Sequence, residues 1–231
     1  MFREPTKLNS EYDAVIIGGG GHGLAAAYYL AKDHGITNVA VLERGYIGGG
    51  GTGRNTAIVR SNYLTPEGVQ FYRGSVELFQ DLSHELNLNL FYSERGHFTL
   101  AHSPASLRIQ RWRAEVNKHL GINSRVVTPN FIKETVPEID LSVGGHQAPI
   151  YGALYHPPGA IARHDAVAWG YARGAGQHGV EIHQQTAVTD IELDDGAVVG
   201  VHTNKGFIKT RKVLSAVAGW TTHITDRKSV V

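Results

Sequence analysis

Residues 12–43 constrain the fold more than any other stretch of this chain. They read as a strand, a glycine turn, a helix, a second strand and an acidic residue. Residues 13–17 are a short apolar run rich in β-branched side chains, which is typical of a buried parallel strand. The alanine-rich residues 24–31 predict a helix, and the apolar residues 38–42 predict the next strand. The order therefore predicts a βαβ unit with a glycine turn before its helix.

The glycine turn has the spacing G-x-G-x-x-G at Gly18, Gly20 and Gly23. The first glycine permits a tight turn, the second lets the backbone approach a pyrophosphate, and the third lets the helix pack against the strand. The free N–H groups and the positive dipole at the helix N-terminus favour an anion there. Glu43 follows Gly23 by about 20 residues, the usual offset of an acid that binds a ribose hydroxyl. The pattern predicts a dinucleotide site.

Composition excludes several other classes. The 231 residues include 22 basic and 21 acidic side chains, so a net charge of +1 gives no reason to expect nucleic acid or an anionic membrane as partner. The chain has no cysteine, which removes disulfides, a thiol nucleophile and cysteine-ligated zinc. The histidines lack metal-ligand spacing, so no metal site is predicted. The first residues lack a signal-peptide core and no apolar run is long enough to span a bilayer, so we expect a cytoplasmic protein.

The remaining chain alternates helices and strands. Residues 1–11 look like a loose leader. Helical spacing or caps predict helices at 65–90, 103–120, 128–136 and 163–178, and apolar runs predict strands at 96–101, 151–156 and 179–183. Residues 187–219 read as a meander of strands, with Asp195-Gly196 and Lys205-Gly206 as hairpin turns. We therefore predict an α/β fold in which a Rossmann-like domain carries an inserted, incomplete α+β domain.

Three segments carry a family resemblance. They are GGGGHGLAAAYYLAKDHGITNVAVLE, RNTAIVRSNY and GALYHPPGAIARHDAVAWGYA. Together they resemble the β subunit of heterotetrameric sarcosine oxidase, a flavoprotein similar to D-amino-acid oxidase, over nearly all of residues 12–220. The resemblance implies that sarcosine is oxidised to an imine at FAD. Electrons then pass to a covalently bound FMN, and oxygen is reduced to hydrogen peroxide.

The same resemblance implies domains and partners. It places a first FAD-domain segment at 1–80, a substrate domain at 81–150 and a second FAD-domain segment at 151–220. Residues 221–231 look like a non-native tail, and their end, DRKSVV, matches a translated sequencing adapter. We therefore expect a natural chain that continues further and holds the substrate-binding residues, so the catalytic residues stay unassigned. The implied partners are α, γ and δ subunits, and other subunits pass the one-carbon unit to tetrahydrofolate.

The resemblance implies FAD contacts one residue at a time. The turn should hold the pyrophosphate, and Glu43 should bind the adenosine ribose with Arg44 beside it. Val188, placed in the strand after the helix at 163–178, should contact the adenine end through its backbone. The turn residues are Gly18, Gly20, Gly21, His22 and Gly23, and the residues expected along the ribityl chain and isoalloxazine ring are Thr52, Arg54, Asn55 and Ile58. Gly51 and Gly53 depart from the family pattern, in which larger residues are expected.

His164 is the residue that the resemblance implies for covalent attachment of FMN. Sequence physics alone would not select it among 13 histidines, since it reads as a polar residue near a helix start. A neutral imidazole can attack an activated flavin methyl carbon, and the adjacent Asp165 could fix its tautomer.

Three other functions stay open. One is a dimethylglycine-type or proline-type dehydrogenase, or a monomeric amine oxidase with one flavin, of the same fold. A second is an NAD-dependent dehydrogenase, which Glu43 alone does not exclude. A third is a truncated flavin-binding module that is inactive by itself.

Overall fold

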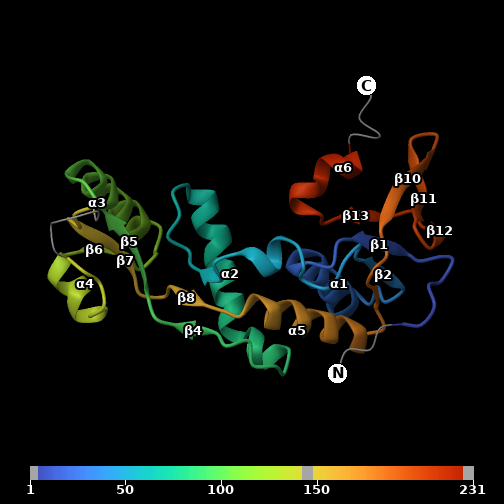
Figure 1. The fold of residues 1–231 in the computed structure, drawn as a ribbon, viewed down its shortest axis with the longest axis horizontal. Helices are drawn as coiled ribbons and strands as arrows, with labels where there is room; N and C mark the ends of the chain where they lie inside the picture. The colour runs from blue at the N-terminus through green and yellow to red at the C-terminus, as the bar shows by residue number, and fades with distance from the viewer. Residues whose placement is uncertain (1–4, 142–147, 226–231) are drawn as a thin grey trace. The chain divides into compact units, whose positions relative to one another are not determined.

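The computed structural model describes residues 5–141 and 148–225 and contains two compact units (Figure 1). The first unit comprises Met1–Thr56, Leu86–Leu90 and Arg163–Val231, and the second comprises Ala57–Glu85 and Phe91–Ala162. The domain boundaries expected at residues 80, 150 and 220 stay predictions. The DRKSVV segment lies outside the described residues.

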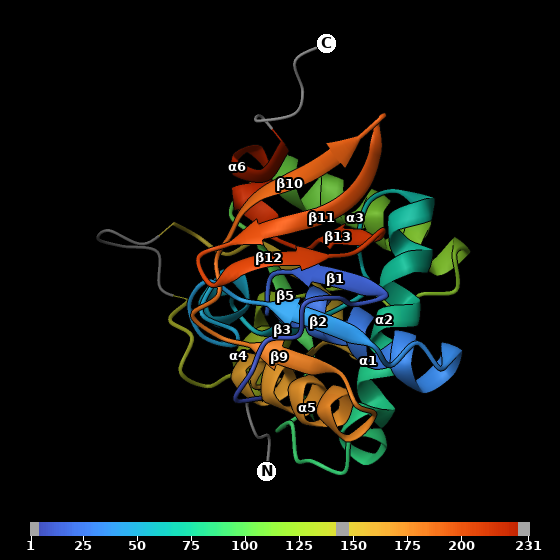
Figure 2. The ribbon, with the colours of Figure 1, turned by 90° about the vertical axis from the view of Figure 1, so that its right-hand side faces the viewer.

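The first unit is built on a four-stranded parallel sheet in the order β13-β1-β2-β9 (Figure 2). Its strands are β1 (Ala14–Ile17), β2 (Val39–Leu42), β9 (Glu181–His183) and β13 (Val213–Ser215). The helix α1 (Gly21–His34) connects β1 to β2, and α5 (His164–Gln177) precedes β9. The predicted βαβ unit is therefore confirmed.

Apolar side chains bury both faces of this sheet, as its strand sequences predict. On one face Val15, Ile17 and Leu42 pack with Val201 and Ile208 of the meander. On the other face α1 packs against α5, with the rings of Tyr28 and Tyr171 at 5.7 Å. Gly174 makes this approach possible, because a Cβ there would lie 2.8 Å from the Tyr28 ring.

The meander forms a separate antiparallel sheet of β10 (Val188–Asp194), β11 (Ala197–Thr203) and β12 (Gly206–Lys209). Asp195 and Gly196 have φ of 46° and 77° and form the predicted two-residue turn between β10 and β11. The second turn lies one residue earlier than predicted, because Thr203 pairs with Gly206. The hydroxyl of Thr203 closes this turn, since it donates to the Gly206 carbonyl at 2.7 Å.

The chain after the meander leaves that sheet. The sequence pattern placed residues 211–219 with the meander, but β13 pairs in parallel with β1 instead. It is followed by the short helices η2 (Ala218–Trp220) and α6 (Thr221–Thr225). β13 therefore completes the parallel sheet and brings the residues that follow it next to the glycine turn.

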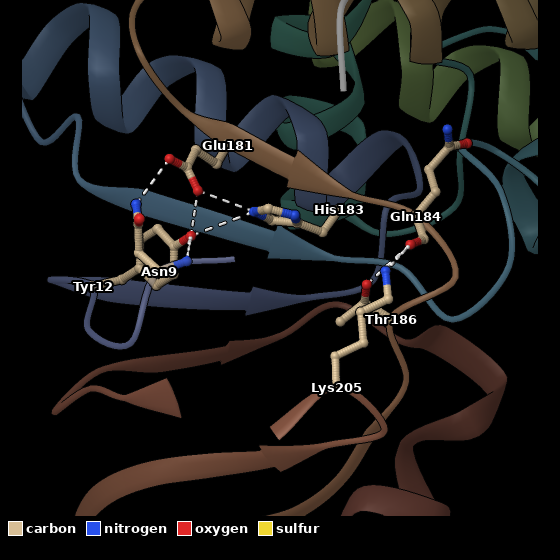
Figure 3. Close-up of polar contacts among 7 residues, drawn as sticks. All are labelled: Asn9, Tyr12, Glu181, His183, Gln184, Thr186 and Lys205. Atoms are coloured by element: carbon tan, nitrogen blue, oxygen red, sulfur yellow. Dashed lines mark hydrogen bonds and ion pairs between the residues drawn. The ribbon is translucent and has the colours of Figure 1, made fainter. Parts of the chain in front are cut away.

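Residues 9–12, directly before β1, are tied to the sheet, so this part of the segment is not the loose leader that was predicted (Figure 3). Tyr12 is buried, and its hydroxyl contacts the Glu181 carboxylate, which also accepts from His183 Nε2 at 3.0 Å. Asn9 Nδ2 donates to Glu181 Oε1 at 2.9 Å. Burial, together with the Glu181 carboxylate, raises the pKa of Tyr12. This network fixes the N-terminal segment against β9, the edge strand.

The second unit contains two three-stranded antiparallel sheets. One has the order β5-β7-β6 and the other β3-β8-β4. The elements of this unit are β3 (Ile58–Val59), α2 (Pro66–Glu85), β4 (Ser93–Glu94), β5 (His97–Ala101), α3 (Pro104–His119), β6 (Arg125–Val127), α4 (Pro129–Thr135), β7 (Gly152–His156) and β8 (Ala160–Ile161). The predicted helices and the strands β5 and β7 are confirmed, whereas β3, β4, β6 and β8 are too short for periodicity to reveal.

Candidate functional site

The candidate cofactor site lies in the first unit, at the carboxyl ends of its parallel strands. The glycine turn follows β1, Glu43 follows β2, and Ala216 follows β13. Because carboxyl ends of neighbouring parallel strands meet at one edge, these segments are brought together by the sheet. This edge is where open α/β sheets bind ligands.

The glycine turn is tight enough to require glycine at two positions. Gly18 has φ +111°, and a Cβ there would lie 2.7 Å from the Ala216 carbonyl oxygen. A Cβ at Gly23 would lie 2.1 Å from the Gly18 carbonyl oxygen. The first contact fixes the turn against β13, and the second fixes the start of α1 against β1. This packing agrees with the roles that the sequence pattern gives to the two residues: Gly18 permits the tight turn, and Gly23 lets the helix pack against the strand.

The N-terminus of α1 has the features of an anion site. Its N-cap is Gly20, which has no side chain to cap the helix, and no acidic residue lies in its first turn. The Gly21 N–H donates to Thr52 Oγ1 at 2.8 Å, and His22 next to it is exposed. The first turn of the helix therefore has no acidic side chain of its own that would compete with a pyrophosphate for its N–H groups.

The Glu43 carboxylate accepts hydrogen bonds from two backbone N–H groups, one in the glycine turn and one in its own loop. Its Oε2 accepts from the Gly19 N–H at 2.8 Å, and its Oε1 accepts from the Gly45 N–H at 2.7 Å. Each carboxylate oxygen has a second lone pair, so ribose hydroxyls can still donate to Glu43. The acid and the glycine turn, which the sequence spacing linked, lie within hydrogen-bond distance.

Gly19 and the loop after β2 are site features that the sequence reasoning missed. A Cβ at Gly19 would lie 2.9 Å from Glu43 Cβ, and the Gly19 carbonyl accepts from the Gly48 N–H at 2.9 Å. The signal was present in the sequence as a run of glycines from 18 to 21, of which the fingerprint uses only two.

A second glycine-rich stretch, residues 48–53, packs beside α5. Residues 51–54 form the short helix η1 (Gly51–Arg54), which lies against α5, and a Cβ at Gly48 would lie 3.3 Å from Ala168 Cβ. Thr52 in this helix lies at the glycine turn, because its hydroxyl accepts from Gly21. Asn55 Nδ2 donates to the Thr52 carbonyl at 2.6 Å, and Arg54 is exposed.

The other expected contact residues lie at different places. The Arg44 guanidinium stacks on the Trp220 ring at 3.7 Å. Val188 opens β10, the second strand after α5 and not the first as expected. Ile58 belongs to β3 in the second unit and is 45% exposed. The assignment of these residues to parts of FAD stays a prediction.

His164 is the first residue of α5, and its side chain is half-buried. Its Nδ1 is buried without a hydrogen-bond partner. The carboxylate expected to orient it is engaged elsewhere, because Arg163 Nε donates to Asp165 Oδ1 at 3.0 Å. That guanidinium holds the pKa of Asp165 below its usual value. The structure therefore shows no support of His164 by Asp165.

No group of three or more potential ligand side chains gathers to hold a metal ion within residues 5–141 and 148–225. In the same part of the chain, no helix combines the length and apolar character needed to cross a membrane.

The second unit holds a cluster of two histidines and two arginines around β5 and β7, namely His97, His156, Arg60 and Arg113. His156 is fully buried; its Nδ1 donates to the Asn123 carbonyl at 2.7 Å, and its Nε2 accepts from the Ser61 N–H at 3.4 Å. Burial lowers the pKa of His156. Burial and the nearby positive charge of Arg60 lower the pKa of His97 to about 4. Both imidazoles are therefore neutral at pH 7.

We expect this cluster to make the protein acid-labile. His97 has an unfolded pKa near 6.5, so below that pH the unfolded chain binds more protons and stability falls until the pH reaches about 4. Between pH 7.5 and 5 the free energy of unfolding should fall by about 1–2 kcal/mol from His97, since partial exposure weakens the full linkage. Urea denaturation at the two pH values measures this.

The matched variants for that measurement are His97→Gln and His119→Gln. His119 ends α3 and is exposed, so its replacement should leave the pH dependence of stability unchanged. His97→Gln should reduce the difference between the two pH values. An unchanged difference in His97→Gln would show that this histidine does not control acid stability.

Comparisons with known proteins agree with the geometry. The model of the FAD dependent oxidoreductase family matches residues 13–230. The sarcosine oxidase β subunit of an Arthrobacter species is 47% identical over 216 residues, which cover 94% of this chain and 52% of that protein. The β subunit from Rhizobium meliloti is 45% identical over 215 residues, covering 93% of this chain and 51% of that protein.

The fold is also similar to that of L-proline dehydrogenase from P. horikoshii. That structure has a TM-score of 0.87 and 27% sequence identity, over 96% of this chain and 57% of the other. The chain spans about half the length of the curated relatives it matches. It belongs to the FAD dependent oxidoreductase family, and the predicted α/β fold with a Rossmann-like domain is confirmed.

Proposed function

We propose that this chain is the FAD-binding part of a sarcosine oxidase β-type subunit, which oxidises the secondary amine sarcosine to an imine. The observation that carries the proposal is the arrangement of Glu43 beside the glycine turn. Its carboxylate accepts hydrogen bonds from the Gly19 and Gly45 N–H groups, next to an α1 N-terminus whose N-cap residue is Gly20. The similarity to two sarcosine oxidase β subunits supports the choice of substrate.

Each part of this site has a task in holding FAD. The N-terminus of α1 binds the pyrophosphate, with Gly20 allowing its close approach and Thr52 beside it. Glu43 accepts hydrogen bonds from the adenosine ribose. When bound, the flavin supplies the chemistry by accepting the hydride equivalent of the amine C–H bond. The protein's part is to hold and orient both the cofactor and the amine.

His164 is proposed to hold a second flavin, FMN, covalently. The support is its position at the start of α5 with Nδ1 buried and without a hydrogen-bond partner. A neutral imidazole has a nucleophilic ring nitrogen, which can form a bond to the flavin. Electrons leaving the FAD would reach oxygen through this group and give hydrogen peroxide.

The proposal includes partner subunits and a location. Relatives at 44–47% identity are named as one subunit of sarcosine oxidase, which supports assembly with other chains. We propose α, γ and δ subunits as those partners and the cytoplasm as the location. FMN would then lie near the boundary with the α subunit.

A second candidate function is an FAD-dependent dehydrogenase for an amino acid or another secondary amine. The observation that favours it is the fold similarity to L-proline dehydrogenase, with a TM-score of 0.87. An NAD enzyme is disfavoured, because the description of the matching family specifies FAD.

The test is to purify the full-length protein with its partner subunits, release its nucleotides by heat and identify them. We expect FAD in the released fraction and hydrogen peroxide that depends on added sarcosine. Flavin reduction by sarcosine without oxygen consumption would favour the dehydrogenase. A colourless protein, or one that releases NAD, would refute the proposal.

A further inference from the structure

Glu43 lies in the loop after β2, residues 43–48. This loop is hydrogen-bonded to one segment on each side. On one side it contacts the glycine turn, since Glu43 accepts from the Gly19 N–H and Gly48 donates to the Gly19 carbonyl. On the other side it contacts the segment 183–186, which connects β9 to the start of β10. The position of Glu43 therefore depends on this second segment as well as on the glycine turn.

Backbone bonds to segment 183–186 hold the start of the loop. The Glu43 N–H donates to the His183 carbonyl at 2.9 Å, and the Thr186 N–H donates to the Glu43 carbonyl at 2.8 Å. Gln185 donates to the Gly45 carbonyl through its own N–H at 3.0 Å. Gln185 has φ 50°, a conformation that costs energy for a residue other than glycine. The segment thus keeps a strained backbone where it bonds the Glu43 loop.

The end of the loop depends on one side chain. Ile47 is buried, and its N–H donates to Gln184 Oε1 at 2.9 Å. The backbone carbonyl of Gln184 is fixed in turn, because Thr186 Oγ1 and Lys205 Nζ donate to it at 2.9 and 3.0 Å (Figure 3). Its side-chain amide extends away from these two donors (Figure 3). Gly48, the next residue after Ile47, then reaches the Gly19 carbonyl.

We infer that Gln184 is a positioning residue for the adenosine end of the cofactor. It acts through the Ile47 amide, which sets the path of the loop between Glu43 and the glycine turn. Without its acceptor, the buried Ile47 N–H loses its partner, and the loop must move to reach water. Glu43 then no longer lies where the ribose hydroxyls meet it. The inference rests on the proposed function, since it assumes that Glu43 binds ribose.

The test measures binding of ADP and 2′,3′-dideoxy-ADP to the full-length protein after removal of FAD. The variant Gln184→Met removes the acceptor and keeps the chain length, and Gln184→Glu restores an acceptor. Gln185→Met is the matched control, because Gln185 Nε2 only adds to the bond that its backbone N–H already makes to the Gly45 carbonyl.

We expect Gln184→Met to weaken ADP binding by about tenfold, the equivalent of about 1.4 kcal/mol. Binding of the dideoxy analogue, which lacks the hydroxyls that Glu43 would bind, should change little. Gln184→Glu should restore ADP affinity and Gln185→Met should retain it. Equal losses for both ligands, or no loss for ADP, would overturn the positioning role. Failure of the wild-type protein to bind ADP would refute the proposed function, and with it this inference.

Discussion

Replacing His164 with alanine is expected to remove all flavin from the acid-precipitated protein, while the wild-type pellet keeps one flavin per chain. Acid unfolds the protein and releases FAD that is held only by contacts, so that flavin passes into the supernatant. A flavin bonded to an imidazole nitrogen stays with the chain. The measurement is the absorption and fluorescence spectrum of pellet and supernatant, recorded separately for the two proteins.

The control for this experiment is His178→Ala. His178 lies at the other end of α5, is exposed, and contacts the Tyr28 ring at 5.8 Å. It tests whether loss of a histidine on this helix disturbs flavin retention in general. Retention in His178→Ala with loss in His164→Ala assigns the bond to His164. Flavin in the supernatant only, in all three proteins, would leave a single-flavin enzyme and make His164 a structural residue.

The sequence predicts the first unit well because its signals are local. Hydrophobic periodicity and glycine spacing lie within single elements, so β1, α1, β2 and α5 appear at their predicted places. The link between Glu43 and the turn also follows from spacing, because neighbouring parallel strands end at the same edge.

Other site features depend on contacts between distant segments, which periodicity does not record. Thr52 reaches the Gly21 N–H across 31 positions, and Gln184 reaches Ile47 across 137. The pairing of β13 with β1 is of the same kind, which is why the residues after the meander were misplaced. The error for Asp165 is the opposite one. Because Asp165 is next to His164 in the sequence, a contact between them was expected, but the Asp165 carboxylate accepts from Arg163 instead.

Replacing Gly23 with alanine is expected to weaken FAD binding by about 100-fold or more, which corresponds to about 2.8 kcal/mol. The added Cβ would lie 2.1 Å from the Gly18 carbonyl oxygen, and that atom belongs to backbone and cannot rotate away. The start of α1 must therefore move from β1, which displaces the N–H groups that face the pyrophosphate. We also expect the free energy of unfolding to fall by about 1–3 kcal/mol, as for other overpacked sites.

The matched control is Gly74→Ala, the same change at an exposed position inside α2 where no atom lies within 4 Å of the added Cβ. Here alanine should raise stability by about 0.5–1 kcal/mol, because it restricts the unfolded chain and favours helix. Titration of the two apo variants with FAD, together with urea denaturation, separates the effects. If Gly23→Ala binds FAD as tightly as Gly74→Ala, the close contact of α1 with β1 is not what presents the helix N-terminus to the cofactor.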